Sequence, residues 1–131
     1  MSLPMSAVML GVQDLARART FYTEGLGFTV AQDVPGFVAL SQGAGAPQLA
    51  LYEWEAAAQD AGVASAGSGF RGVSFHLNPA AREEVDETMR SAVAAGGSVV
   101  RAAAGADWGG YYGYCSDPDG HLWKITTYGS A

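Results

Sequence analysis

One order of secondary-structure elements occurs twice in this sequence, and this repetition constrains the fold more than any other feature. In the first half, the apolar segment AVMLGV (7–12) predicts a strand, and Asp14 is a typical N-cap for a helix that continues to Glu24. Three further strands, separated by glycine-containing turns, are predicted at FTVAQD (28–33), FVALSQ (37–42) and QLALYEW (48–54). The first half therefore has the order strand, helix, strand, strand, strand.

The second half repeats this order. GVSFHL (72–77) predicts a strand, Asn78 and Pro79 predict the start of a helix, and the pair Gly96-Gly97 predicts its end. Further strands are predicted at SVVRA (98–102), YYGYCS (111–116) and HLWKITT (121–127). We therefore expect a single domain over residues 1–131, made of two modules at roughly 5–54 and 70–128 and joined by an Ala/Gly/Ser-rich connector at 55–69.

A module of this size cannot cover both faces of its own sheet, so the two modules must pack together or across a dimer. A chain of 131 residues is long enough to form one hydrophobic core. A helix on one side of mostly antiparallel strands leaves the other face of the sheet uncovered. We expect a ligand to bind at that uncovered face.

The charge balance limits the partners of the chain. Seven basic residues against thirteen acidic residues give a net charge of −6. This excess argues against nucleic acid binding, which needs a basic surface, and it is compatible with a neutral or cationic small ligand. The single cysteine, Cys115, has no partner for an internal disulfide, and neither a signal peptide nor an apolar run of the ~18 residues that a membrane helix needs is visible. These features predict a cytoplasmic protein with no membrane partner.

Two segments resemble the signature segments of a known family. VMLGVQDLARARTFYTEGLGF (8–28) and GGYYGYCSDPDGHLWKI (109–125) are similar to those of the vicinal oxygen chelate superfamily. This superfamily includes glyoxalases, bleomycin resistance proteins, extradiol dioxygenases and fosfomycin-resistance enzymes. The resemblance implies an α+β fold of paired βαβββ modules, with curled, antiparallel-rich sheets around a cavity, and it implies a homodimer.

The resemblance also identifies four positions where metal-dependent members hold a divalent ion with His, Gln or Glu side chains. In this sequence they are Ala7, Ala50, Gly72 and Lys124. Alanine and glycine have no side-chain ligand atom, and a protonated lysine repels a divalent cation. The chain is therefore interpreted as a member of the family without the usual metal, and no cofactor is predicted.

The DPDG turn (117–120) has a structural explanation. An aspartate at the first position accepts local backbone hydrogen bonds, Pro118 restricts φ, and Gly120 tolerates a left-handed conformation. Asp117 and Asp119 are therefore interpreted as turn residues rather than catalytic residues.

The two histidines are predicted to face different sides of the second module. His76 has the same strand parity as Gly72 and is expected to face the cavity, whereas His121 has the opposite parity to Lys124. The two imidazoles are therefore not expected to bind one ion together.

Strand alternation and the resemblance together select the ligand-binding candidates, which are Tyr52, Trp54, Ser74, His76, Trp108, Tyr111 and Lys124. Tyr111 and Cys115 share one face of their strand and Tyr112 and Tyr114 share the other. The register at the DPDG turn decides which pair faces the cavity, and the family pattern favours Tyr111. For the four aromatic candidates, a place in the core or in a dimer interface is the alternative, and Lys124 could instead extend to solvent. Cys115 is expected to be a buried structural thiol.

Several functions remain open from the sequence. The first is binding of a small organic molecule, a drug or a metabolite, without chemistry, as bleomycin resistance proteins do. The alternative is a metal-independent enzyme of the lyase or isomerase type, in which Lys124 and His76, with Tyr111, perform acid–base catalysis. A metal-dependent glyoxalase or dioxygenase is opposed by the four positions above, and a structural or partner-binding protein is a further alternative. Whether the chain is an enzyme is therefore left open.

Overall fold

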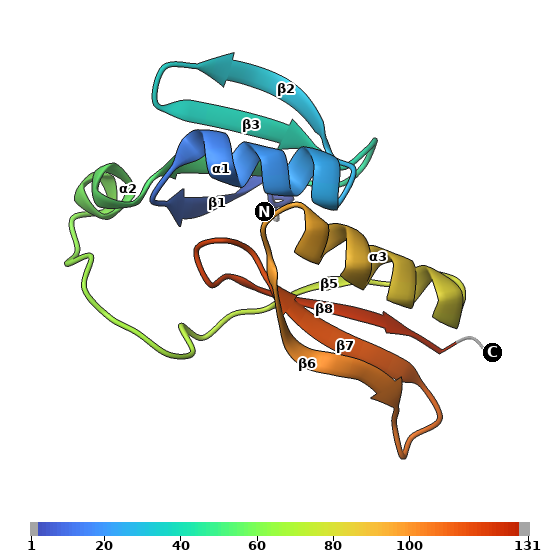
Figure 1. The fold of residues 1–131 in the computed structure, drawn as a ribbon. Coiled ribbons are helices and arrows are strands. Elements are labelled where there is room, and N and C mark those ends of the chain that lie inside the picture. The colour runs from blue at the N-terminus through green and yellow to red at the C-terminus, as the bar shows by residue number, and fades with distance from the viewer. Residues whose placement is uncertain (1–2, 129–131) are drawn as a thin grey trace.

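The computed structural model describes residues 3–128, which form two four-stranded sheets with helices packed against them (Figure 1). In chain order the elements are β1 (Ala7–Val12), α1 (Leu15–Thr20), the π-helical turn η1 (Phe21–Gly25), β2 (Thr29–Val34), β3 (Phe37–Ser41), β4 (Gln48–Glu53), α2 (Trp54–Ala61), β5 (Phe75–Leu77), α3 (Arg82–Ala94), β6 (Ser98–Gly105), β7 (Tyr111–Ser116) and β8 (Leu122–Thr127). None of the helices in residues 3–128 is long and apolar enough to cross a membrane.

The two sheets have the same topology. The N-terminal sheet has the strand order β1-β4-β3-β2, and the C-terminal sheet has the order β5-β8-β7-β6. In each sheet the first strand of the module pairs in parallel with the last, and the other neighbours are antiparallel. The expected α+β fold of paired βαβββ modules is therefore confirmed, although the two sheets remain separate and do not close into one barrel.

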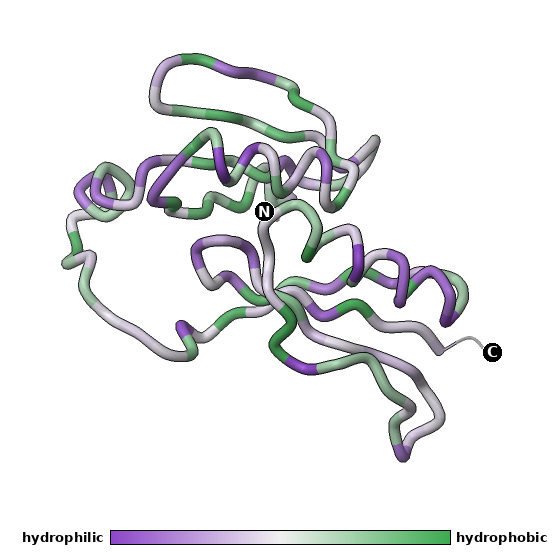
Figure 2. The backbone as a smooth tube through the Cα atoms, viewed as in Figure 1, coloured by the Kyte–Doolittle hydropathy of each residue, from purple (hydrophilic) through white to green (hydrophobic). Residues whose placement is uncertain are grey.

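One hydrophobic core connects the two modules. Strand alternation buries Leu10 and Val12 of β1 on the helix side of the N-terminal sheet, and Trp123 and Ile125 of β8 on the helix side of the C-terminal sheet. Helix α3 is mostly hydrophilic in Figure 2, and it buries a stripe of three residues, Val85, Met89 and Ala92. In the view of Figure 1, α1 and α3 lie between the two sheets, and the other face of the C-terminal sheet carries no helix, whereas the start of α2 at Trp54 lies against Gly11 of β1.

The first helix begins as expected and the second does not. Asp14 is extended and its carboxylate accepts a hydrogen bond from the backbone N–H of Arg17 at 3.0 Å, so it is the N-cap of α1. Helix α3 begins at Arg82 after an extended Ala81, three residues beyond the predicted start at Pro79. The prediction was wrong because an Asn-Pro pair is compatible with a turn as well as with a helix start.

Two predicted strands are shorter than expected. β5 begins at Phe75, and Gly72 lies outside it with a φ of +87°, a conformation that interrupts a strand. The predicted parity of Gly72 with His76 therefore does not apply. β4 ends at Glu53, and Trp54 starts α2, so this ring does not continue the alternation of β4.

Candidate functional site

The face of the C-terminal sheet opposite α3 carries a row of polar and aromatic side chains. His76 of β5 pairs with Lys124 of β8. On the next strand, β7, Tyr114 pairs with Lys124 on one side and with Arg101 of β6 on the other. Directly paired residues project to the same side of a sheet, so these four side chains share one face. We call this surface the open face.

Lys124, the single lysine of the sequence, lies among aromatic rings on the open face. Its Nζ is 4.6 Å from the ring centre of Tyr112, 5.9 Å from that of Trp108 and 6.0 Å from that of Tyr114. The guanidinium of Arg101 lies 5.3 Å from the ring centre of the same Tyr112. Both cations are within the distance at which an aromatic face attracts a positive charge.

Neither cation of this cluster has a carboxylate partner among the described residues. The two ion pairs formed within residues 3–128 use Arg17 and Arg19 instead. Thr126 lies opposite Tyr112 on the open face, is only 5 % exposed, and its hydroxyl has no hydrogen-bond partner in the described part of the chain. The open face therefore presents two positive charges without a carboxylate partner in the described residues, above one buried, unpartnered hydroxyl.

A hollow of about 230 Å³ lies beside this cluster, where the β6–β7 loop leaves the sheet. It is lined by Arg101, Ala104, Gly105, Ala106, Asp107, Trp108 and Tyr112. The indole of Trp108 stacks on Tyr112 with ring centres 6.0 Å apart, and 49 % of Trp108 is exposed. Trp108 lies directly over Gly110, and a Cβ at position 110 would overlap the indole ring. Trp108 therefore forms one wall of the hollow.

Tyr111 does not share a face with Lys124, and the prediction that it does is wrong. Its hydroxyl donates a hydrogen bond of 2.6 Å to Asp86 of α3, and the guanidinium of Arg82 lies 5.2 Å from its ring centre. The hydrogen bond to Asp86 raises the pKa of Tyr111. The open face instead receives Tyr112 and Tyr114, which the sequence analysis had placed on the other side of the strand.

A signal for this register was present in the sequence. Residues equidistant from Asp119 pair across the β7–β8 hairpin, Ser116 with Leu122 and Tyr114 with Lys124. Counting outward from Asp119, the centre of the five-residue segment DPDGH (117–121), selects Tyr114. Counting from the centre of the four-residue DPDG turn instead pairs Gly113 with Lys124 and selects the wrong face. The place of Arg101 had no such signal, because β6 contains two register shifts relative to β7 on either side of it.

The remaining candidates are distributed over three places. Ser74 Oγ and His76 Nε2 lie 3.2 Å apart, beside Lys124. Tyr52 is in the N-terminal sheet, where its ring centre lies 6.3 Å from that of Phe37. The structure of one chain therefore brings Ser74, His76, Trp108 and Lys124 to the C-terminal sheet and leaves Tyr52 in the other module.

Trp54 lies at the start of α2 rather than on the open face. Its Nε1 donates a hydrogen bond of 3.0 Å to the carbonyl of Ser65, and its ring stacks at 6.0 Å on His121. His121 also forms a 2.7 Å hydrogen bond to the carbonyl of Gly11. The two histidines therefore have different partners, since His76 interacts with Ser74.

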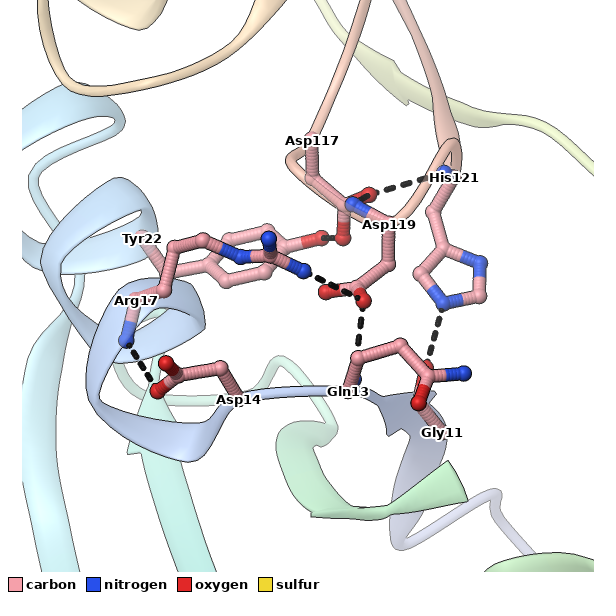
Figure 3. A network of polar contacts seen from close by, with 8 residues as sticks. All are labelled: Gly11, Gln13, Asp14, Arg17, Tyr22, Asp117, Asp119 and His121. Carbon is pink, nitrogen blue, oxygen red and sulfur yellow. Dashed lines mark hydrogen bonds and ion pairs between the residues drawn. The ribbon is translucent and has the colours of Figure 1, made fainter. Parts of the chain in front are cut away.

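The DPDG turn connects the two modules (Figure 3). Asp117 Oδ1 accepts hydrogen bonds from the backbone N–H of Asp119 at 2.9 Å and of His121 at 2.8 Å, as expected for a turn residue. Asp119 Oδ1 accepts a 2.8 Å hydrogen bond from the backbone N–H of Gln13 and lies 3.0 Å from Arg17 Nη2. The turn of the second module therefore binds the start of α1 in the first, a role that the sequence analysis missed.

Asp117 is also part of a buried polar chain. The hydroxyl of Tyr22 donates a 2.7 Å hydrogen bond to Asp117 Oδ2 and accepts a 3.1 Å hydrogen bond from Trp123 Nε1. Burial raises the pKa of Asp117, and burial together with the negative charge of Asp117 raises that of Tyr22. Burial also raises the pKa of the Cys115 thiol to about 11, so this fully buried side chain is a neutral core residue.

The raised pKa of Asp117 predicts a pH dependence of stability. A carboxyl group with a higher pKa in the folded state binds more protons when folded, so its contribution to stability increases as the pH falls from 7 through the folded pKa toward the ordinary value of 3.8. Asp117→Asn lacks this contribution. We therefore expect the stability difference between wild type and Asp117→Asn to favour wild type more at pH 4 than at pH 7, measured by urea unfolding at both values. A stability difference that is the same at both pH values, or reversed, would contradict the raised pKa of Asp117 in the folded state.

The paired modules and the segments that form them match one family of known proteins. The model of the Glyoxalase/Bleomycin resistance protein/Dioxygenase superfamily matches residues 5–125. The chain belongs to this superfamily. None of the curated proteins matches the sequence significantly.

Solved structures of other proteins have the same superfamily fold. A glyoxalase-related enzyme from Fulvimarina pelagi is 32% identical, with a TM-score of 0.85 over 95% of this chain and 87% of that chain. A hypothetical protein from S. aureus is 27% identical, with a TM-score of 0.83 over 97% of this chain and 94% of that one. For a lactoylglutathione lyase from Agrobacterium tumefaciens, the identity is 22% and the TM-score 0.69, over 97% of this chain and 95% of that chain, which is a similarity of fold alone.

The residues at the four positions that the family resemblance assigns to metal ligands do not fit a metal ion. Ala7 and Ala50 offer methyl groups, Gly72 offers no side chain and Lys124 offers an ammonium group. Ala7 and Ala50 lie in the N-terminal sheet and Lys124 in the C-terminal sheet. In the described residues, no group of three or more His, Cys, Asp or Glu side chains is arranged to hold an ion.

Proposed function

We propose that this member of the glyoxalase superfamily binds a small organic molecule at the open face of its C-terminal sheet, without a metal ion. One observation carries the proposal: the ammonium group of Lys124, at a position that the family resemblance assigns to a metal ligand, is surrounded by Tyr112, Tyr114 and Trp108. Aromatic faces supply contact area for an organic ligand, and an ammonium group orients it.

A screen of purified, EDTA-treated protein by thermal shift tests this proposal. The library contains small organic acids, amines and neutral aromatic compounds. We expect at least one compound to raise the melting temperature, and we expect this effect to be lost in Lys124→Met, which keeps the length of the side chain and removes its charge. Stoichiometric divalent metal in the purified protein, or binding that requires added metal, would contradict the proposal.

A second candidate function is metal-independent acid–base catalysis at the same place. The observation that favours it is that His76 lies directly opposite Lys124 in the parallel β5–β8 pair and within 3.2 Å of Ser74 Oγ. Conversion of a bound compound, followed by mass spectrometry, distinguishes the two functions. Loss of turnover with retained affinity in His76→Ala would support catalysis, and unchanged compound in all cases would leave binding as the function.

We also propose that the chain forms a homodimer. The faces and edges of the sheets that lack helices expose apolar side chains, including Met9, Val30, Val34, Val99 and Val100. A second copy of the chain would remove this apolar surface from water. Sedimentation analysis over a range of protein concentrations tests this: a single species with the mass of one chain at all concentrations would contradict it.

A further inference from the structure

We infer that the ligand of the open face is a small planar aromatic anion, such as an aromatic carboxylate. This inference depends on the proposed function, since it names the class of molecule that the open face would bind. It differs from the expectation based on the net charge of −6, which is compatible with a neutral or cationic ligand. The charges near the hollow favour an anionic ligand over a neutral or cationic one.

The first step concerns the charges. Lys124 Nζ and the guanidinium of Arg101 lie 4.6 and 5.3 Å from the same ring centre, that of Tyr112. Neither has an acidic partner in an ion pair within residues 3–128. Asp107 is the one carboxylate that lines the hollow. Two unpaired positive charges around one ring repel each other and repel a cationic ligand, and an anion bound near both would reduce that repulsion.

The second step concerns the rings. Trp108 and Tyr112 are stacked with an interplanar angle of 17°. The ring centre of Tyr128 lies 5.1 Å from that of Trp108. Half of the Trp108 surface is exposed, so part of its π surface remains accessible. A flat ring of a ligand can stack on this surface while its anionic group reaches the two cations. Stacking of this kind favours a planar ligand over a compact aliphatic one.

The third step concerns size and the remaining polar group. The hollow measures about 230 Å³, which is below the ~300 Å³ at the lower end of sites for drug-sized ligands. A molecule with one or two rings therefore fits better than a large glycopeptide or macrocycle. The hydroxyl of Thr126 lies on the same face without a partner in the described residues, but it is buried and does not line the hollow, so the ligand is not expected to contact it.

The single lysine makes a site-specific test possible. Reductive methylation with ¹³C-formaldehyde labels Lys124, the only lysine, in addition to the N-terminus, and a dimethylated lysine keeps its positive charge. Four probes are titrated separately: 2-naphthoate, 2-naphthalenemethanol, 2-naphthylmethylammonium and cyclohexanecarboxylate. The ¹H–¹³C signal of dimethyl-Lys124 reports binding at the open face, and calorimetry with unlabelled protein gives the affinities.

We expect 2-naphthoate to shift the Lys124 signal and to bind at least about tenfold more tightly than the other three probes, with an affinity that falls as salt is added. Lys124→Met and Arg101→Gln should each weaken its binding by about tenfold or more. Gly110→Ala should weaken it as well, because the added methyl group displaces the Trp108 ring. Arg90→Gln is the matched control, because Arg90 is exposed on α3, on the other side of the sheet, and should leave the affinity unchanged. Thermal unfolding of each variant establishes that it is folded.

The outcomes separate the two proposals. If the cationic or neutral naphthyl probe, or cyclohexanecarboxylate, binds as tightly as 2-naphthoate and shifts the Lys124 signal, the inference is wrong and the proposed binding function stands. The same holds if compounds from the thermal-shift screen bind at Lys124 and none of the four probes does. If no compound of either set changes the Lys124 signal or the melting temperature, both proposals are wrong.

Discussion

Gly97→Ala is expected to reduce the free energy of unfolding by about 3 kcal/mol, the upper end of the range for overpacking a core position. Gly97 lies between α3 and β6, and its backbone N–H donates a 3.0 Å hydrogen bond to the carbonyl of Ala92. A Cβ added at this position would lie 2.5 Å from Phe21 Cε1 and 2.6 Å from the carbonyl oxygen of Ser116. One of these contacts is with backbone, and Phe21 is fully buried, so neither group can move without disturbing the core.

Gly105→Ala is the matched control for this substitution. Gly105 is at the end of β6, and no atom lies within 4 Å of an added Cβ. We expect its effect on stability to remain within about 0.5 kcal/mol, as for surface substitutions in general. Urea unfolding of wild type and both variants measures the three free energies. Equal midpoints for the two variants would contradict the close approach of α3, η1 and β7 at Gly97.

Tyr22→Phe is expected to cost about 2–4 kcal/mol, because it removes one hydroxyl and leaves two buried polar groups without a partner. The hydroxyl donates to Asp117 Oδ2 and accepts from Trp123 Nε1, and all three side chains are at most 2 % exposed. A buried carboxylate oxygen that loses a hydrogen-bond donor keeps its desolvation penalty, which the lost hydrogen bond had offset. Asp117 belongs to the turn of the second module and Tyr22 to η1 of the first, so the variant also weakens the contact between modules.

Tyr52→Phe is the control for this variant. Tyr52 is partly exposed in β4, and its hydroxyl forms no hydrogen bond with another described residue. Its loss is expected to change the unfolding free energy by less than about 0.5 kcal/mol. Chemical denaturation of both variants, followed by tryptophan fluorescence, gives the two values. A cost for Tyr22→Phe that is no larger than that for Tyr52→Phe would show that the buried polar chain does not stabilise the fold.

The net charge of the chain and the charge of its candidate site have opposite signs. Seven basic residues are spread over a chain with thirteen acidic ones, and two of the seven, Arg101 and Lys124, each lie within 5.3 Å of the centre of the Tyr112 ring. The potential at a binding site depends on the charges within a few ångströms more than on the total, because solvent and salt screen distant charges. A prediction of ligand charge from composition alone therefore has little weight for this protein.

The sequence by itself determined the features that depend on neighbours along the chain. The order of strands and helices within each module, the N-cap at Asp14 and the hydrogen bonds of the DPDG turn were predictable, because each depends on residues at most a few positions apart. Helix α2 in the connector lies outside the predicted order. The repeated order predicted two similar modules, and the family resemblance implied the α+β fold that the two similar sheets form. These features depend on local interactions and on strand alternation, which can be recognised in a single sequence.

Only the tertiary structure decided which side chains meet. Tyr111 and Tyr112 are adjacent in the sequence, yet one contacts Asp86 of α3 and the other contacts Lys124 on the open face. Their orientations depend on the register between β7 and β8, and a shift of one residue would exchange them. Arg101 reaches the same ring through a strand with two bulges, and Tyr22 reaches Asp117 across 95 residues of chain. Such contacts depend on how separate elements pack, and no pattern within a single strand or helix specifies that packing.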